Sequence, residues 1–355
     1  MLSRIALAAA ALMITTAVAF SQKTPDAAAK KPALVVGLPA PQLQIEKWVK
    51  GSPVAGFEKG KVYVVEFWAT WCGPCIAGMP HLSALQRQYR DKGVTFIGVT
   101  SADTRGNDLP AVEAMVEDKG DVMDYTVAWD SGRATSEAYM KAAARNGIPC
   151  CFLVDAAGKI AYIGHPMFLD LPMEQVVAGT WDIEKGNAAI AEAEAKYSAI
   201  RKAIGTDPKS APAKISEFES NFPILARLVS PMKFDAFLAA GDFPAAYAAG
   251  SKLVDEAIKQ ENAGDLNAIA WKIVDPEANW ATLDLDLAMR AAAQGVALTH
   301  EKDGSILDTL ARVYFLKGDT KKAIEIQTKA VDVSTDRMKG SLEKTLAEYK
   351  AKSAQ

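Results

Sequence analysis

Two cysteines separated by two residues lie where a strand-like run meets a helix-like run, and this junction strongly constrains the fold. Residues 62–67 (VYVVEF) form a continuous β-prone run, typical of a buried strand. The motif CGPC at residues 72–75 follows shortly after it and leads into apolar residues at helical spacing. We therefore expect both cysteines at the start of a helix, close enough for their sulfurs to bond.

This position predicts a reactive dithiol. A thiolate at a helix N-terminus is stabilised by unpaired backbone N–H groups and by the positive end of the helix dipole. Cys72 should therefore ionise more readily than a free cysteine and attack a disulfide, and Cys75 should resolve the mixed disulfide. We also expect Cys72 to be exposed above Cys75. A passive disulfide is the alternative, but so short a loop would stabilise the fold little.

Further runs predict an α/β fold, with a central mixed sheet flanked by helices. Residues 34–60 are broken by prolines and glycines, so they are expected to be irregular or a hairpin. The remaining predicted elements are strands at 94–99 and around 125–128, helices at 109–119 and 136–144, and a hairpin formed by CCFLVD and KIAYIG.

The segment EFWATWCGPC closely resembles the thioredoxin active site. Pro80 and the segment Gly147-Ile148-Pro149 match further positions, and residues 34–175 are most similar to the TlpA-like, extracytoplasmic branch of the thioredoxin-like (redoxin) superfamily. The resemblance implies a cis peptide bond before the proline of the latter segment. It also implies a substrate groove formed by Trp71, Gly73, Pro74, Ile148 and Pro149.

Glu66 interrupts the apolar strand six residues before Cys72, where thioredoxins carry a buried acid. Burial raises the pKa of a carboxyl group, so Glu66 could exchange a proton with Cys75 during resolution. The alternative is an exposed position at the edge of the sheet, which would make Glu66 an ordinary surface acid.

The chain has two more cysteines, Cys150 and Cys151, directly after the expected cis-proline. On a strand they point to opposite faces, so at most one can approach Cys72. They are interpreted as small buried residues; alternatively, Cys150 is an auxiliary thiol in a relay with Cys72. Because adjacent cysteines lack the ligand spacing of a zinc site, no metal is expected.

Residues 1–21 have the layout of a signal peptide: Arg4 is the only charged side chain, and small residues such as Ala19 and Ser21 end the segment. We expect cleavage there and export to the periplasm or another extracytoplasmic compartment. A retained membrane anchor is the alternative, although the 16-residue apolar run is shorter than the roughly 20 residues that span a bilayer. Residues 22–33 are a predicted linker.

The chain is long enough for two domains, predicted as a thioredoxin-like domain at 34–180 and an all-α domain at 181–355. Residues 305–331 resemble a tetratricopeptide hairpin, and residues 234–335 are predicted to be tetratricopeptide-like. Apparent counterpart helices lie 41 residues apart, rather than the roughly 34 of a regular array. A plain helical bundle is therefore the alternative.

Together these features predict a protein-disulfide reductase that acts on disulfide-bearing exported proteins without a cofactor. The Gly-Pro spacer is that of thioredoxin, and the resemblance implies re-reduction by a membrane electron donor. With 40 basic and 43 acidic residues, nothing indicates a nucleic-acid partner.

Two other functions are alternatives. The helical domain could be the main actor, binding a protein partner while the thioredoxin-like domain senses redox state. A peroxiredoxin-type peroxidase shares the fold, but it needs a proline and a threonine where this chain has Val65 and Ala69.

Overall fold

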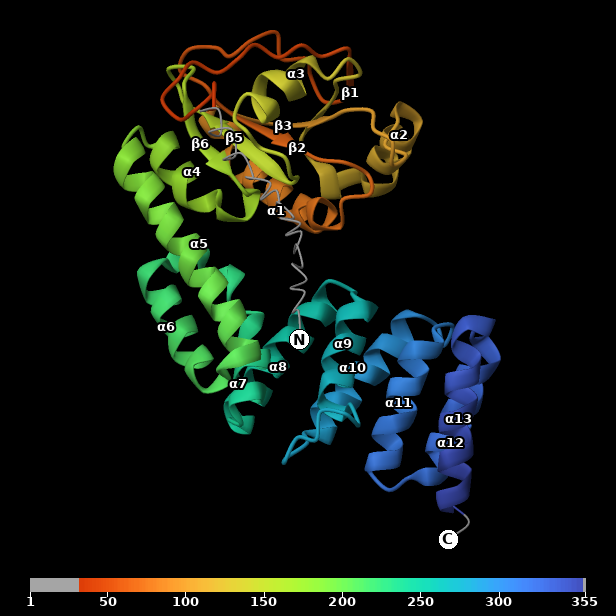
Figure 1. Cartoon of the computed structure of the whole chain (residues 1–355). Coiled ribbons are helices and arrows are strands. Elements are labelled where there is room, and N and C mark those ends of the chain that lie inside the picture. The colour runs from red at the N-terminus through yellow and green to blue at the C-terminus, as the bar shows by residue number, and fades with distance from the viewer. Residues whose placement is uncertain (1–31, 354–355) are drawn as a thin grey trace, which may run out of the picture.

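The computed structural model describes residues 32–353, which form an α/β part followed by a helical part (Figure 1). The predicted signal peptide and nearly all of the predicted linker lie outside the described residues. Within residues 32–353, no helix combines the length and the apolar character needed to cross a membrane.

The α/β part is built on a six-stranded mixed sheet with the strand order β1-β4-β3-β2-β5-β6. Strands β2, β3 and β4 run parallel, whereas β1, β5 and β6 each pair antiparallel with their neighbour. The predicted α/β class is confirmed. The strands are β1 (Lys47–Lys50), β2 (Val62–Phe67), β3 (Val94–Thr100), β4 (Thr126–Trp129), β5 (Cys150–Val154) and β6 (Ile160–Gly164).

Helices and short turns cover both faces of this sheet. The helices are α1 (Gly73–Tyr89), α2 (Leu109–Lys119), α3 (Ala134–Ser136) and α4 (Asp170–Val177). The 3₁₀ turns are η1 (Arg90–Lys92), η2 (Gly120–Met123) and η4 (Pro166–Phe168), and η3 (Glu137–Lys141) is a π-helical turn.

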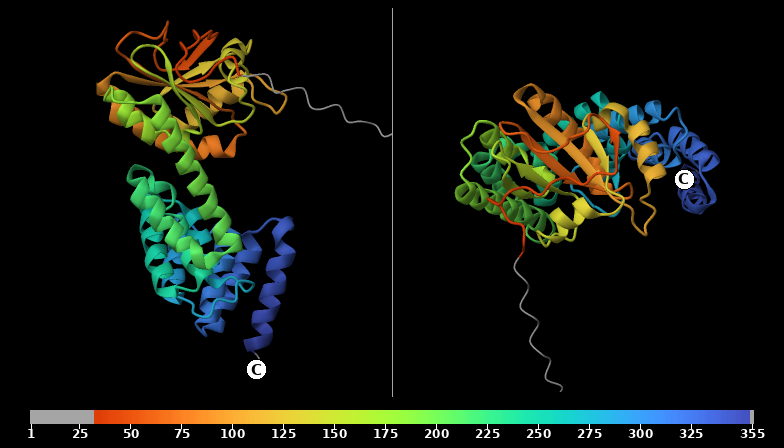
Figure 2. Two further views of the ribbon diagram at one scale, coloured as in Figure 1. Left: turned by 60° about the vertical axis from the view of Figure 1, so that its left-hand side comes forward. Right: turned by 90° about the horizontal axis from the view of Figure 1, so that it is seen from above.

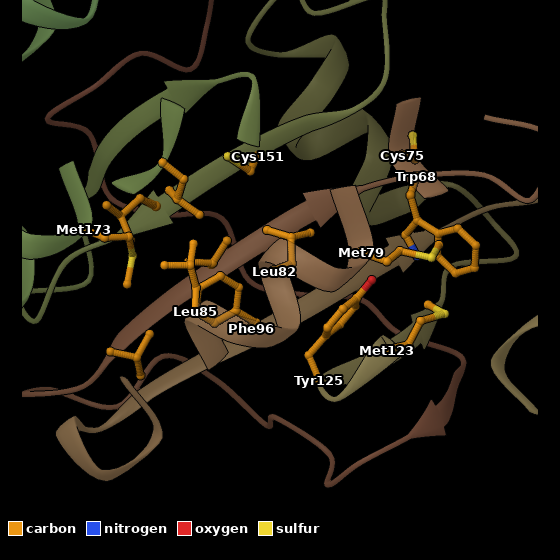
Figure 3. Packing of buried hydrophobic residues seen from close by; sticks show 14 of the residues in the cluster. Trp68, Cys75, Met79, Leu82, Leu85, Phe96, Met123, Tyr125, Cys151 and Met173 are labelled. Atoms are coloured by element: carbon orange, nitrogen blue, oxygen red, sulfur yellow. The ribbon is translucent and has the colours of Figure 1, made fainter. Parts of the chain in front are cut away.

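Strand β2 lies at the centre of two apolar cores because all six of its residues are buried and alternate between faces. Val62 and Val64 contact the core that α1, α2 and α4 cover, whereas Val65 and Phe67 contact the core around η3. Figure 3 shows the first core, in which side chains of α1 meet the sheet. Each large apolar side chain buried in this way contributes about 1.5–3 kcal/mol to stability.

Two local expectations are met only in part. Residues 34–60 contain the edge strand β1, which has only four residues and two lysines, so its apolar pattern was too short to indicate a strand. Residues 136–144 do not continue as a regular helix: α3 passes into η3, where the N–H of Ala142 bonds the carbonyl of Glu137, five residues earlier.

The second part of the chain is all helical, as predicted, and contains two further apolar cores. Helices α9 to α13 contact one another in sequence order and lie side by side (Figure 1). Their classification as tetratricopeptide-like repeats stays a prediction. The helices are α5 (Ile183–Thr206), α6 (Ala211–Asn221), α7 (Met232–Ala240), α8 (Phe243–Lys259), α9 (Ala263–Val274), α10 (Leu285–Leu298), α11 (Gly304–Leu316), α12 (Thr320–Val333) and α13 (Asp336–Ser353), with 3₁₀ turns η5 (Pro208–Ser210) and η6 (Pro223–Leu228).

Helix α5 runs from the α/β part into the helical part (Figure 2), and the residue before its N-cap is hydrogen-bonded to the sheet. The indole N–H of Trp181 donates to the carbonyl of Ala161 on β6 at 3.0 Å. Gly186 packs against the same indole so closely that a Cβ atom would lie 2.1 Å from the ring. The absence of a side chain at this position therefore lets α5 pack directly against the indole that bonds the sheet.

We expect Gly186→Ala to lower the free energy of unfolding by about 2 kcal/mol, because the indole must shift and lose its hydrogen bond. Urea unfolding measures the change. Gly205→Ala is the matched control in the same helix, since a Cβ there meets no atom within 4 Å. Equal effects of the two substitutions would contradict the role given to Gly186.

Candidate active site

Cys72 and Cys75 form a disulfide, with an S–S distance of 2.07 Å. Cys72 is the residue directly before α1, and its sulfur accepts a hydrogen bond from the backbone N–H of Cys75 at 3.2 Å. The sulfur thus takes the place of the oxygen with which serine or aspartate caps a helix. Pro74 suits the first turn because it has no N–H to satisfy. The pair lies at the strand-to-helix junction that the sequence predicts.

The expectation that Cys72 is exposed above Cys75 is wrong for this disulfide form. Each cysteine has only 3% of its surface exposed. Both belong to the apolar core between α1 and the sheet, and the half-buried Trp71 and Ile148 pack against that core. The two residues between the cysteines, Gly73 and Pro74, are exposed, and the flanking Trp71 and Ile148 are partly exposed.

Trp71 is held in place by the loop after β3. Its indole N–H donates to a carboxylate oxygen of Asp103 at 2.6 Å, and the guanidinium of Arg105 lies 3.5 Å from the ring centroid. Desolvation opposes ionisation of Asp103, but hydrogen bonds from Trp71 and from the backbone N–H groups of Arg105 and Asn107 lower its pKa. The sequence did not predict these contacts of Trp71, and the polar loop SADTRGND was their only signal.

Glu66 is a buried acid, with 3% of its surface exposed, so the alternative of an edge position is wrong. It lies on the central strand, opposite Gly98 on β3 and Cys151 on β5. Desolvation by burial raises the pKa of Glu66 to about 8. Its carboxyl group can therefore hold or release a proton near neutral pH.

A cavity of about 210 Å³ beneath the start of α1 brings Glu66 and Cys75 together. Pro149, which also lines the cavity, follows Ile148 through a cis peptide bond, as the resemblance implied. His165 also lines the cavity, as does Arg227, which comes from the helical part of the chain. The cavity therefore joins the carboxyl group, one sulfur and the cis-proline in a single space.

Arg227, in η6, connects the helical part of the chain with the α/β part. Its Nη2 donates to the carboxylate of Asp170 and, at 2.9 Å, to the carbonyl of Met167. Asp170 also lies 3.0 Å from Nε2 of His81 on α1. Burial would raise the pKa of Asp170, but hydrogen bonds from His81 and Arg227 outweigh it and lower that pKa. No sequence pattern indicated this contact.

Cys150 and Cys151 are buried free thiols on opposite faces of β5. Cys151 belongs to the core under α1 (Figure 3), whereas Cys150 belongs to the core that includes Phe67. Burial raises the pKa of Cys150 to about 11 and that of Cys151 well above its ordinary value. The thiol that shares a face with Glu66 is therefore Cys151, not the candidate auxiliary thiol Cys150. Across residues 32–353, no cluster of three or more His, Cys, Asp or Glu side chains could hold a metal ion.

Comparisons with known proteins agree with this geometry. The Redoxin family model matches residues 35–171. Protein FixW of Rhizobium leguminosarum is 30% identical over 152 residues, which cover 42% of this chain and 69% of FixW. The thiol-disulfide oxidoreductase ResA of Bacillus anthracis is 34% identical over 102 residues, covering 29% of this chain and 53% of ResA. The thiol:disulfide interchange protein HelX of Rhodobacter capsulatus is 29% identical over 171 residues, covering 46% and 88% of the two chains.

The mixed sheet, the helix-capping dithiol and these relatives define a thiol–disulfide oxidoreductase of the thioredoxin fold. This chain belongs to the redoxin family. It spans about half the length of the Bacillus ResA proteins that it matches, and the family match ends at residue 171, before the helical part begins.

We expect Glu66→Gln to change how stability depends on pH. The native carboxyl keeps its proton up to about pH 8, whereas the unfolded one ionises near its ordinary pKa of 4.5. Between these values the native state binds more protons, so the stability of the wild-type protein falls as pH rises. Glu66→Gln has no such ionisation. Its free energy of unfolding should therefore rise by roughly 4 kcal/mol relative to that of the wild-type protein between pH 4.5 and 8. Urea unfolding of the oxidised proteins across this range tests it; parallel curves would contradict the assignment.

We also expect Cys150 and Cys151 to remain thiols after gentle oxidation, because burial suppresses both thiolates. Alkylation under denaturing conditions followed by mass spectrometry should find only the Cys72–Cys75 linkage. A peptide that joins Cys150 to Cys72 would support the relay instead.

Proposed function

We propose that this protein is a protein-disulfide reductase that acts on disulfide-bearing exported proteins. The observation that carries the proposal is the position of Cys72 before α1, where its sulfur accepts the N–H of Cys75. After reduction, the same N–H group and the helix dipole stabilise a thiolate on this sulfur. The Cys72 thiolate is then the nucleophile for disulfide exchange.

The reaction proceeds in two exchanges. The Cys72 thiolate attacks one sulfur of the substrate disulfide, forms a mixed disulfide and releases the other substrate sulfur as a thiolate. Cys75 then attacks the Cys72 sulfur, which closes the intramolecular disulfide and releases the second substrate sulfur. The substrate gains two electrons and the enzyme loses two.

Glu66 serves the second exchange, in which Cys75 must lose its proton before it attacks. The two groups share one cavity, and a pKa of about 8 allows both protonation states of the carboxyl near neutral pH. We assign Glu66 the role of proton acceptor for Cys75. The substrate chain would lie over the residues that flank the disulfide and the cis peptide bond: Trp71, Gly73, Pro74, Ile148 and Pro149.

The Gly-Pro spacer supports the reducing direction. Thioredoxin, which has the same spacer, has a reduction potential of about −270 mV, against about −120 mV for the strongly oxidising dithiol protein DsbA. Each turnover leaves the enzyme oxidised, so a membrane electron donor would have to restore the dithiol. Titration against glutathione should place this couple nearer the reducing value, and a potential near the oxidising value would reverse the assigned direction.

Residues 1–21 support export, because they combine one positive charge, an apolar run and small residues at the end. The helical part of the chain has a separate proposed role as a surface for a protein partner. Arg227 of this helical part lines the cavity and bonds Asp170, which supports a function linked to the redox site.

We expect the full chain to reduce insulin disulfides and Cys72→Ser to lose this activity by several orders of magnitude, because it lacks the attacking thiolate. Cys75→Ser should form stable mixed disulfides with its substrates, since the first adduct is left unresolved. Non-reducing electrophoresis and mass spectrometry would identify these adducts.

The double variant Cys72→Ser/Cys75→Ser is the control for trapping and should form no adducts. Insulin reduction by Cys72→Ser at the wild-type rate would contradict the assigned nucleophile. Adducts of Cys75→Ser that survive reducing agent would likewise show that they are not disulfides.

A further inference from the structure

A second, larger hollow lies beside the disulfide, on the Trp71 side. This groove has a volume of about 460 Å³ and lies at the carboxyl ends of the parallel strands β2 and β3. One end is bordered by Trp71 and Ile148, the residues next to Cys72 and to the cis-proline. An extended chain whose cysteine meets Cys72 would therefore continue into the groove.

The groove is lined by more basic than acidic side chains. The basic residues are Arg105, Arg133, Lys141 and Arg145, and the acidic residues are Asp103 and Glu137. Both acids already have partners in the protein, since Asp103 bonds the indole of Trp71 and Glu137 pairs with Lys141. This surplus of positive charge is local to the groove, because the whole chain has a formal net charge of −3.

Two guanidinium groups of the groove each bond a backbone carbonyl and have no carboxylate partner among residues 32–353. Arg133 donates one N–H to the carbonyl of Ala102 at 3.1 Å, and Arg145 donates one to the carbonyl of Ile163 at 3.2 Å. Both side chains are exposed, so their remaining N–H groups face solvent or an incoming ligand. A guanidinium whose other N–H groups are free can bind a carboxylate with two hydrogen bonds.

We propose that this groove selects substrates in which acidic residues lie next to the cysteine that Cys72 attacks. The occupant is an extended polypeptide segment, whose aspartate or glutamate side chains bind Arg133 and Arg145. A polypeptide fits because the groove is lined by Trp71 and Ile148, the neighbours of Cys72 and of the cis-proline, and is larger than one side chain requires. This inference rests on the proposed reductase function and adds its substrate class.

The test uses the full-length reduced protein and three peptides that share one disulfide and differ only in flanking residues: glutamate, glutamine or lysine. At low salt we expect kcat/KM to be about 10-fold higher for the glutamate peptide than for the lysine peptide. The difference should shrink at high salt, which screens charges on an exposed surface. The double charge reversal Arg133→Glu/Arg145→Glu should invert the preference, with the rates for the glutamate and lysine peptides each divided by the rate of the same variant for the glutamine peptide.

Arg201→Glu is the matched control, because it makes a charge reversal at an exposed position on α5, outside the groove. It should keep the preference for the glutamate peptide. Equal rates for the glutamate and lysine peptides, or a preference that survives the double reversal, would overturn the inference and leave the reductase function standing. Failure to reduce any of the three peptides would contradict the reductase function itself, and the inference with it.

Discussion

The hydrogen bond from the Cys75 N–H to the Cys72 sulfur fixes the chemistry of this molecule to its architecture. This hydrogen bond forms because β2 ends shortly before α1 begins. Strand β2 is itself held in place by pairing with β3 on one side and β5 on the other. Helix α1 is in turn positioned by its apolar face, where Met79, Leu82 and Leu85 pack on the sheet (Figure 3). A sulfur that caps a helix therefore depends on the whole α/β core for its environment.

The surroundings of the disulfide divide into two sides with different chemistry. One side is the smaller cavity, which is lined by the buried Glu66, by Cys75 and by Arg227. The other side is an open groove with a surplus of positive charge. Proton exchange uses the cavity that Glu66 lines, because burial raises the pKa of this carboxyl group to about 8, close to neutral pH. Recognition of a partner needs the solvent-exposed side, where charges can attract from a distance.

The sequence predicted the central elements well because their signals are local. Strand β2 and helix α2 have the predicted limits, and the burial of Glu66 follows from its place in a continuous apolar run. Contacts between distant segments were not predictable in this way: the hydrogen bond from Trp71 to Asp103 spans 32 residues, and that from Arg227 to Asp170 spans 57. The burial of Cys72 was missed for the same reason, since it depends on neighbours from several elements.

The most direct test of this account is the ionisation of Cys72 in the reduced protein. In a Cys75→Ser variant, the rate of alkylation at Cys72 is followed as a function of pH by mass spectrometry of the peptide that contains Cys72, which distinguishes it from Cys150 and Cys151. The account predicts that Cys72 is half-ionised about one pH unit or more below the value of about 8.5 for a free cysteine. Half-ionisation at or above about pH 8.5 would contradict stabilisation of the thiolate by the helix N-terminus.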